Sequence, residues 1–170
     1  MPKLITQYVK IIDLICTKVG RITMYGVYLM MFILVLSFVT RNIINFPLMW
    51  IIEMAQFTMT AYYFLGGAYS MQMGDHVRMD LFYGNLSERG KAKMDIFTSA
   101  FLLFYLVTLL IGSVSSLIYT IETKQKLFTA WAPYVWPIKV LMLTGILLML
   151  LQTLSILFKD IAKLKGRKIN

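Results

Sequence analysis

The sequence predicts an all-α integral membrane protein with four transmembrane helices, both termini in the cytoplasm, and an N-terminal amphipathic helix at the membrane interface. Three observations predict this fold class: the apolar composition, four long apolar runs, and the uneven placement of lysine and arginine. Of the 170 residues, 59% are hydrophobic, and the mean hydropathy is +0.71. A soluble domain is only about 45–50% apolar. Too few polar residues remain to cover a surface that faces water.

Residues 3–19 have an amphipathic pattern. At about 100° per residue, apolar side chains such as Val9 and Ile12 fall on one face, and polar ones such as Lys10 and Asp13 fall on the other. A helix of this kind lies in the headgroup plane with its basic face toward anionic lipid. We therefore expect an interfacial helix that binds membrane lipids. The alternative is a plain extension of the first span into the cytoplasm.

Four apolar runs set the transmembrane spans, at about 20–40, 47–73, 94–121 and 137–159. About 20 helical residues cross a hydrocarbon core roughly 30 Å thick. The second and third runs are longer than this, so we expect tilt or extension beyond the bilayer. Because lipid offers no hydrogen bonds to the backbone, each run must be helical. The whole chain, residues 1–170, is then a single membrane domain.

Lysine and arginine indicate the orientation of these spans. Thirteen of the 17 precede the first span, follow the fourth, or lie between the second and third. The remaining four are Arg41, Lys124, Lys126 and Lys139. The positive-inside rule therefore predicts that both termini are cytoplasmic, and all three tryptophans then fall on the opposite side. The net charge of +9 belongs to this pattern, so we expect no nucleic-acid partner.

Glu53 is the carboxylate placed within the second span. A carboxylate at membrane depth is costly and indicates function by default. It is the candidate coupling site of an autonomous four-span, proton-coupled exporter of small molecules. The alternative is an interfacial glutamate that pairs with Arg41 or Lys139. A carrier that works alone also lines its path with polar groups and discontinuous helices, and neither pattern occurs here.

Small residues recur within the spans. Gly66 and Gly67 lie in the second, and Gly112 lies in the third, four residues after Thr108 and four before Ser116. Small side chains let helices approach closely. We expect these positions to pack against other helices, within this chain or in a partner.

The segment MQMGDHVRMD, residues 71–80, contains the only histidine. Gly74 follows a long apolar run, as a C-cap glycine does. His76 and Asp80 with a neighbouring aspartate give too few ligands for zinc, which takes four or three plus water. We expect no metal there. The predicted roles are a hydrogen bond from His76 in the turn, helix capping by an aspartate such as Asp80, and headgroup contact by Arg78.

One histidine and one cysteine also argue against an enzyme subunit, such as a quinone-linked cytochrome or a thiol oxidase. Such proteins need several ligands or paired thiols. We expect no enzyme activity and no cofactor.

The motifs together resemble a known family. Trp50-x-x-Glu53 opens the second span, Leu65-Gly66-Gly67-Ala68 lies in its middle, and the run His76 to Asp80 reads His-Val-Arg-Met-Asp. With four spans and both ends inside, this pattern resembles the DctQ-like small membrane subunit (Q subunit) of tripartite ATP-independent periplasmic (TRAP) transporters, and its general look is close to the sialic-acid (SiaQ) type. The family often carries a second acid beside the position of Glu53, where this chain has Ile52 and Met54.

The resemblance implies a multi-pass protein of the bacterial inner membrane with two protein partners. A large membrane subunit (M subunit) moves an organic acid by a sodium-coupled elevator motion, and a periplasmic binding protein (P subunit) captures that acid. The small subunit braces the first and helps to dock the second. Arg41, Lys124 and Lys126 are the predicted docking residues, because they are basic and lie on the predicted periplasmic side. Anchoring of the helix ends is the alternative.

Overall fold

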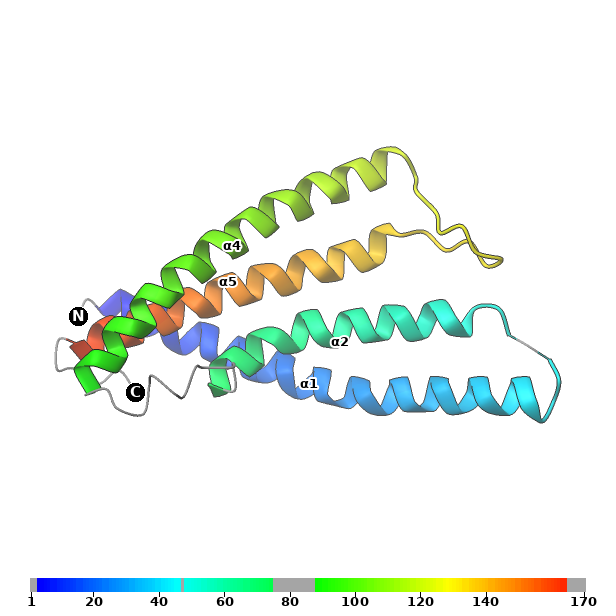
Figure 1. Cartoon of the computed structure of the whole chain (residues 1–170), viewed down its shortest axis with the longest axis horizontal. Coiled ribbons are helices and arrows are strands. Elements are labelled where there is room, and N and C mark those ends of the chain that lie inside the picture. Colours follow the sequence, from blue (N-terminus) through cyan, green and yellow to red (C-terminus); the bar gives the residue numbers. More distant parts are fainter. Residues whose placement is uncertain (1–2, 47, 75–87, 165–170) are drawn as a thin grey trace.

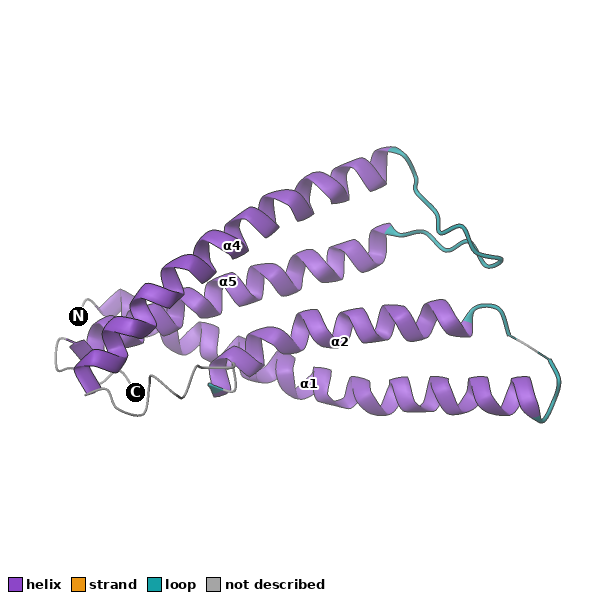
Figure 2. Ribbon diagram, viewed as in Figure 1, coloured by secondary structure: helices purple, strands orange, loops and turns teal. Residues whose placement is uncertain are grey.

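The computed structural model describes residues 3–46, 48–74 and 88–164, and these form a bundle of four α-helices (Figure 1). The helices are α1 (Lys3–Asn42), α2 (Ile51–Met73), α4 (Glu88–Glu122) and α5 (Trp136–Leu164). Residues 43–46 and 48–50, which follow α1 and precede α2, lie at the same end of the bundle as the connection 123–135. No strand occurs among the described residues (Figure 2). The all-α prediction is confirmed for this part of the chain.

Among the described residues, three helices are long and apolar enough to cross a membrane: Leu4–Asn42, Lys93–Glu122 and Trp136–Leu164. α2 has 23 residues, which is sufficient length. It is not among the three, because Glu53, Gln56 and several tyrosines lower its hydropathy. The use of α2 as a fourth span therefore stays a prediction.

α1 is one continuous helix of 40 residues, which corrects the prediction of a separate interfacial helix over residues 3–19. Gly20 marks the expected boundary, yet it lies inside the helix and packs against the side chain of Tyr69 from α2. The apolar face of this segment is also occupied by protein, because Val9 and Cys16 are 2% and 1% exposed. The structure has the helical extension that was the alternative.

The core lies where α1, α2 and α5 meet. Ile12 and Cys16 of α1 and Ala68 of α2 are buried together, and Leu148 and Met149 of α5 pack around them. α5 packs against each of the other helices, whereas α4 packs chiefly on α5 and stands away from α2 (Figure 1). The bundle is therefore closed on the α1 side and open between α2 and α4.

α2 and α5 approach backbone to backbone at one crossing. A Cβ added to Gly145 of α5 would lie 2.6 Å from the carbonyl oxygen of Phe64 in α2. Real Cβ atoms essentially never come that close to another heavy atom. Glycine is therefore required for this crossing at its present distance.

Candidate functional site

A partly buried polar cluster joins α1 to α5. The carboxylate of Asp13 in α1 accepts hydrogen bonds from Lys159 Nζ at 2.5 Å, Gln152 Nε2 at 3.1 Å and Ser155 Oγ at 3.2 Å. Lys159 also forms an ion pair with this carboxylate, and Gln152 and Ser155 are fully buried. Hydrogen bonds between membrane helices contribute about 0.6 kcal/mol each on average. The cluster therefore holds the first half of α1 against the second half of α5.

α2 joins the same cluster through Gln72. Its Nε2 donates to the backbone carbonyl of Asp13 at 3.1 Å and to Thr17 Oγ1 at 3.0 Å. The Thr17 hydroxyl in turn donates to the carbonyl of Asp13 at 2.7 Å. Three helices that are far apart in sequence thus meet at one residue, Asp13.

Sequence reasoning missed this cluster, although a signal was present. Gln152, Ser155 and Lys159 are spaced i, i+3 and i+7, so they share one face of an otherwise apolar helix. A polar stripe in an apolar helix indicates bonding to another helix. Lys159 was used only to orient the chain, and Asp13 was assigned to the polar face of an interfacial helix.

Glu53 lies in the first turn of α2 and is only 5% exposed. Its Oε2 atom is buried and has no hydrogen-bond partner among the described residues. The positive end of the helix dipole favours a carboxylate in this turn. The expected pairing with Arg41 or Lys139 is not found in the described structure, because the Lys139 ammonium bonds elsewhere and Arg41 is exposed.

Lys139 instead bridges α5 to α4. Its Nζ donates to Thr120 Oγ1 at 2.5 Å, to Ser116 Oγ at 2.8 Å and to the Ser116 carbonyl at 3.3 Å. All three acceptors are neutral. The ion pairs Asp13–Lys159 and Asp160–Lys163 do not include Lys139. The charge of Lys139 is therefore solvated by hydroxyl and carbonyl oxygens without a carboxylate beside it.

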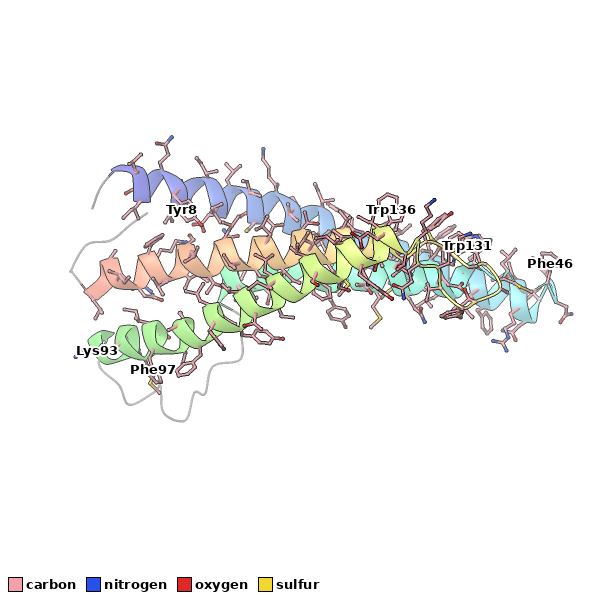
Figure 3. All side chains as sticks on the ribbon, turned by 90° about the horizontal axis from the view of Figure 1, so that it is seen from above. Tyr8, Phe46, Lys93, Phe97, Trp131 and Trp136 are labelled. Carbon is pink, nitrogen blue, oxygen red and sulfur yellow. The ribbon has the colours of Figure 1, made fainter. Side chains whose placement is uncertain are left out.

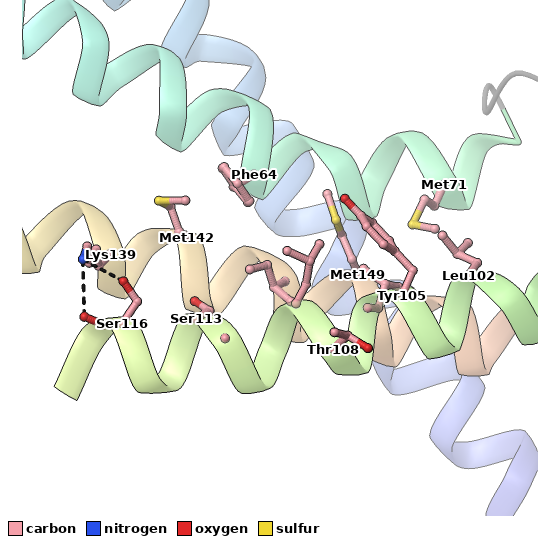
Figure 4. A pocket seen from close by; sticks show the side chains of 14 residues that line it. Phe64, Met71, Leu102, Tyr105, Thr108, Ser113, Ser116, Lys139, Met142 and Met149 are labelled. Carbon is pink, nitrogen blue, oxygen red and sulfur yellow. Dashed lines mark hydrogen bonds between the residues drawn. The ribbon is translucent and has the colours of Figure 1, made fainter. Parts of the chain in front are cut away.

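A cavity of about 640 Å³ lies between α2, α4 and α5, and Lys139 lines one end of it. Figure 4 shows Phe64 and Met71 of α2 on one side and Tyr105 of α4 on the other, with Met149 between them. The walls are mostly aliphatic, aromatic and methionine side chains. The cavity occupies the opening that α4 leaves by packing chiefly on α5.

The connection between α4 and α5 is a short hairpin. The Leu127 N–H donates to the Pro133 carbonyl at 3.0 Å. Lys126 pairs with Tyr134 as an antiparallel bridge, and its Nζ lies 4.8 Å from the centre of the Tyr134 ring. These contacts order the hairpin, yet Phe128 near its tip is fully exposed. An ordered loop thus presents an aromatic side chain and a cation together.

The three predicted docking residues are exposed and lie at the end of the bundle that carries this hairpin. Arg41 is in the last turn of α1, while Lys124 and Lys126 follow α4. Figure 3 shows Trp131 and Trp136 toward this same end. The structure therefore brings the three cations to one end of the molecule.

The predicted packing glycines differ in their surroundings. A Cβ added to Gly67 would overlap the terminal methyl of Met149, whereas one added to Gly66 would meet Thr23 Cγ2 at 3.7 Å, an ordinary contact. A Cβ added to Gly112 would meet nothing within 4 Å. Gly112 therefore faces open space in this chain and lines the cavity.

His76, Arg78 and Asp80 lie outside the described residues. Gly74, just before them, ends α2 in the left-handed conformation with φ of 80°, and its N–H bonds to the Met71 carbonyl at 3.3 Å. The C-cap prediction is confirmed. Among the described residues, no three side chains of histidine, cysteine, aspartate or glutamate gather at one point.

Comparison with known proteins gives one family. Residues 30–163 match the family described as "Tripartite ATP-independent periplasmic transporters, DctQ component". The match begins within α1 and ends one residue before the end of α5. A search of curated proteins finds no match.

Proposed function

The chain belongs to the DctQ component family of tripartite ATP-independent periplasmic transporters, and from this premise we propose that it is the small membrane subunit that braces the large subunit of such a transporter. Members of this family are transport subunits, not enzymes, and work with a large membrane subunit and a periplasmic binding protein. The chain is a multi-pass membrane protein. We place it in the bacterial inner membrane with both termini in the cytoplasm.

One observation carries the bracing role: α4 presents a long apolar stripe away from the rest of the bundle. Phe97, Phe101 and Phe104 are spaced i, i+4 and i+7, and they are 63%, 63% and 75% exposed. Contiguous exposed apolar surface of this kind marks contact with a protein or with lipid. Because α4 packs chiefly on α5, its stripe is available to a neighbouring subunit. We place the large subunit against this stripe.

The polar side chains support a brace rather than a carrier. The Asp13 cluster and the Lys139 cluster both bond one helix of this chain to another. Such groups are used in holding the helices together and do not form a line of free polar groups across the described bundle. Relative motion of the helices would break them. A rigid frame of this kind suits a subunit against which a moving partner slides.

Reconstitution tests this proposal. The chain alone, in liposomes with a sodium gradient, should show no uptake of organic acids above empty vesicles, because it lacks a polar path. Co-reconstitution with the large subunit and binding protein should restore uptake. Uptake by the chain alone that Glu53→Gln abolishes and Glu122→Gln spares would overturn the proposal and favour the proton-coupled exporter.

We further place the periplasmic binding protein at Arg41, Lys124 and Lys126. Charge complementarity mainly speeds encounter and weakens with ionic strength. The double variant Lys124→Glu/Lys126→Glu should therefore lower uptake by the assembled transporter, more at low salt than at high salt, while the two membrane subunits still co-purify. Lys10→Glu, an exposed lysine near the other end of α1, is the matched control. Equal uptake at every ionic strength would leave these residues as anchors of the helix ends.

The transported substrate we propose is an organic acid, and the sequence resemblance to the sialic-acid type makes sialic acid the candidate. Uptake of labelled sialic acid by the assembled transporter should exceed uptake of a small dicarboxylate. The reverse preference would rule out the sialic-acid type and would leave the bracing role untouched, because that role does not depend on which acid moves.

A further inference from the structure

The cavity between α2, α4 and α5 has the size of a ligand site. Its volume is about 640 Å³, within the range of about 300–1,000 Å³ that is usual for small-molecule sites. It is lined by apolar side chains over most of its length, including Phe64, Leu106 and Ile146. A water-soluble solute has little to bond to along these walls. The occupant that fits them is an apolar chain.

The length of the cavity suits an extended chain. Its lining on α4 runs from Leu102 to Ser116, which at 1.5 Å per residue is about 21 Å. Half of a hydrocarbon core is about 15 Å thick, so the cavity is long enough for an extended acyl chain of one leaflet.

One end of the cavity is polar and positively charged. The Lys139 ammonium is held there by Ser116 and Thr120 of α4, and Ser113 lines the cavity one turn away from Ser116. Figure 4 shows Lys139 beside Ser116, at the opposite end from Met71 and Leu102. A serine hydroxyl that accepts a hydrogen bond still has its own proton to donate. A cation with adjacent hydroxyl donors and no carboxylate partner in the described chain attracts an anion, most strongly where little water is present.

We propose that this cavity binds a phospholipid, with one acyl chain between α2 and α4 and the phosphodiester at Lys139 and its neighbouring serines. The combination of a long apolar wall with a single cationic end matches the chemistry of such a lipid. The lipid fills the gap that helix packing leaves between α2 and α4. It thereby gives α4 a second support besides α5.

Photolabelling of the full chain in nanodiscs tests this site. The probes are a phosphatidylglycerol and a diacylglycerol, each with a photoreactive diazirine in one acyl chain. Labelling of peptides from α4 and α5 should be about tenfold higher for the phosphatidylglycerol, because only that probe offers a charged partner to Lys139. Lys139→Gln keeps a donor for Ser116 and Thr120 but removes the charge. It should lower phosphatidylglycerol labelling to the level of the diacylglycerol while the helix content by circular dichroism stays the same.

A second variant tests the apolar part of the cavity. Gly112→Leu projects a side chain into space that is open in the structure, so it should fold normally and reduce labelling by the phosphatidylglycerol. Lys124→Gln, an exposed lysine at the same end of the molecule, should leave labelling unchanged. Equal labelling by both probes, or labelling that neither Lys139→Gln nor Gly112→Leu reduces, would overturn the proposal. Co-purification with the large subunit provides a second measurement. If Gly112→Leu abolished co-purification while lipid labelling stayed the same, the proposal would fail, and the cavity would be the binding site of a partner helix.

Discussion

Asp13 is the residue on which three helices converge. Its carboxylate bonds to three side chains of α5, and its backbone carbonyl accepts a hydrogen bond from Gln72 of α2. The side chains of Lys159 and Asp13 keep 30% and 24% of their exposure, so water screens part of their attraction. Each partner nonetheless depends on the other, because removal of either one strands a partly buried charge.

Replacement of this carboxylate should therefore destabilise the bundle. Asp13→Asn keeps the shape of the side chain but removes the counter-ion of Lys159. We expect a loss of about 1–2 kcal/mol in the free energy of unfolding, a value reduced for the solvent that reaches the pair. Thermal melting of the purified protein in detergent, followed by circular dichroism, measures it. Glu122→Gln, at an exposed carboxylate that ends α4, is the control and should shift the melting temperature little.

A double-mutant cycle separates pairing from packing. If the cluster acts as described, Asp13→Leu with Lys159→Met should destabilise less than the sum of the two single changes, because no charge is left unpaired. Strict additivity would mean that the two side chains act independently, contrary to the geometry.

The sequence showed both members of this pair but not their pairing. Asp13 and Lys159 are 146 residues apart, and periodicity assigns a residue to a face of its own helix without saying which helix that face meets. The same limit applied to Glu53. The sequence predicted that Glu53 lies in the second span and that a carboxylate there is energetically unfavourable. Its proposed partners, Arg41 and Lys139, depended on which helices are neighbours, and hydropathy does not encode this.

At the scale of the helices, the contact between α2 and α5 at Gly145 is too close to accept a larger side chain. The backbone of α2 at Phe64 lies against Gly145, so a methyl group at this position must push the two helices apart. Gly145→Ala should destabilise the bundle by about 1–3 kcal/mol, as overpacking typically does, and should lower the yield of folded protein. Melting in detergent measures the first effect, and size-exclusion chromatography measures the second.

Two other glycines provide a graded comparison. The methyl group added by Gly67→Ala contacts the flexible end of Met149, which can move. The loss in the free energy of unfolding should therefore be smaller than for Gly145→Ala. Gly112→Ala meets nothing within 4 Å and should be neutral or stabilising by up to about 1 kcal/mol, because alanine is the better helix former. If all three variants melted alike, helix propensity rather than the α2–α5 crossing would control their stability.

The third and fourth helices were predicted closely from the sequence, whereas the predicted break in the first helix was wrong. The third and fourth apolar runs, at about 94–121 and 137–159, lie within α4 and α5. Residues 3–19 were separated from the first span because their hydropathy pattern changes near Gly20. A helix continues wherever its backbone bonds continue, and a change of side-chain character does not interrupt them. Burial of the apolar face against α2 and α5 is a tertiary effect, absent from any local pattern.

At the scale of the whole molecule, the first and last described residues lie at the same end of the bundle. Lys3 begins α1 and Leu164 ends α5 at that end, and the hairpin 123–135 lies at the other (Figure 1). This arrangement fits an even number of crossings, as the four predicted spans require. The distribution of lysine and arginine predicts that the end with Lys3 and Leu164 faces the cytoplasm.

Thiol labelling can test this orientation. Cys16 is 1% exposed, and Cys16→Ser gives a cysteine-free background in which Thr129→Cys marks the hairpin and Leu4→Cys marks the start of α1. Both positions are exposed, Leu4 by 78%. In spheroplasts, a membrane-impermeant maleimide should label Thr129→Cys directly and Leu4→Cys only after permeabilisation, because thirteen of the 17 basic residues are predicted to lie inside. The reverse pattern would invert the topology and would place Lys124 and Lys126 in the cytoplasm, where no periplasmic protein could reach them.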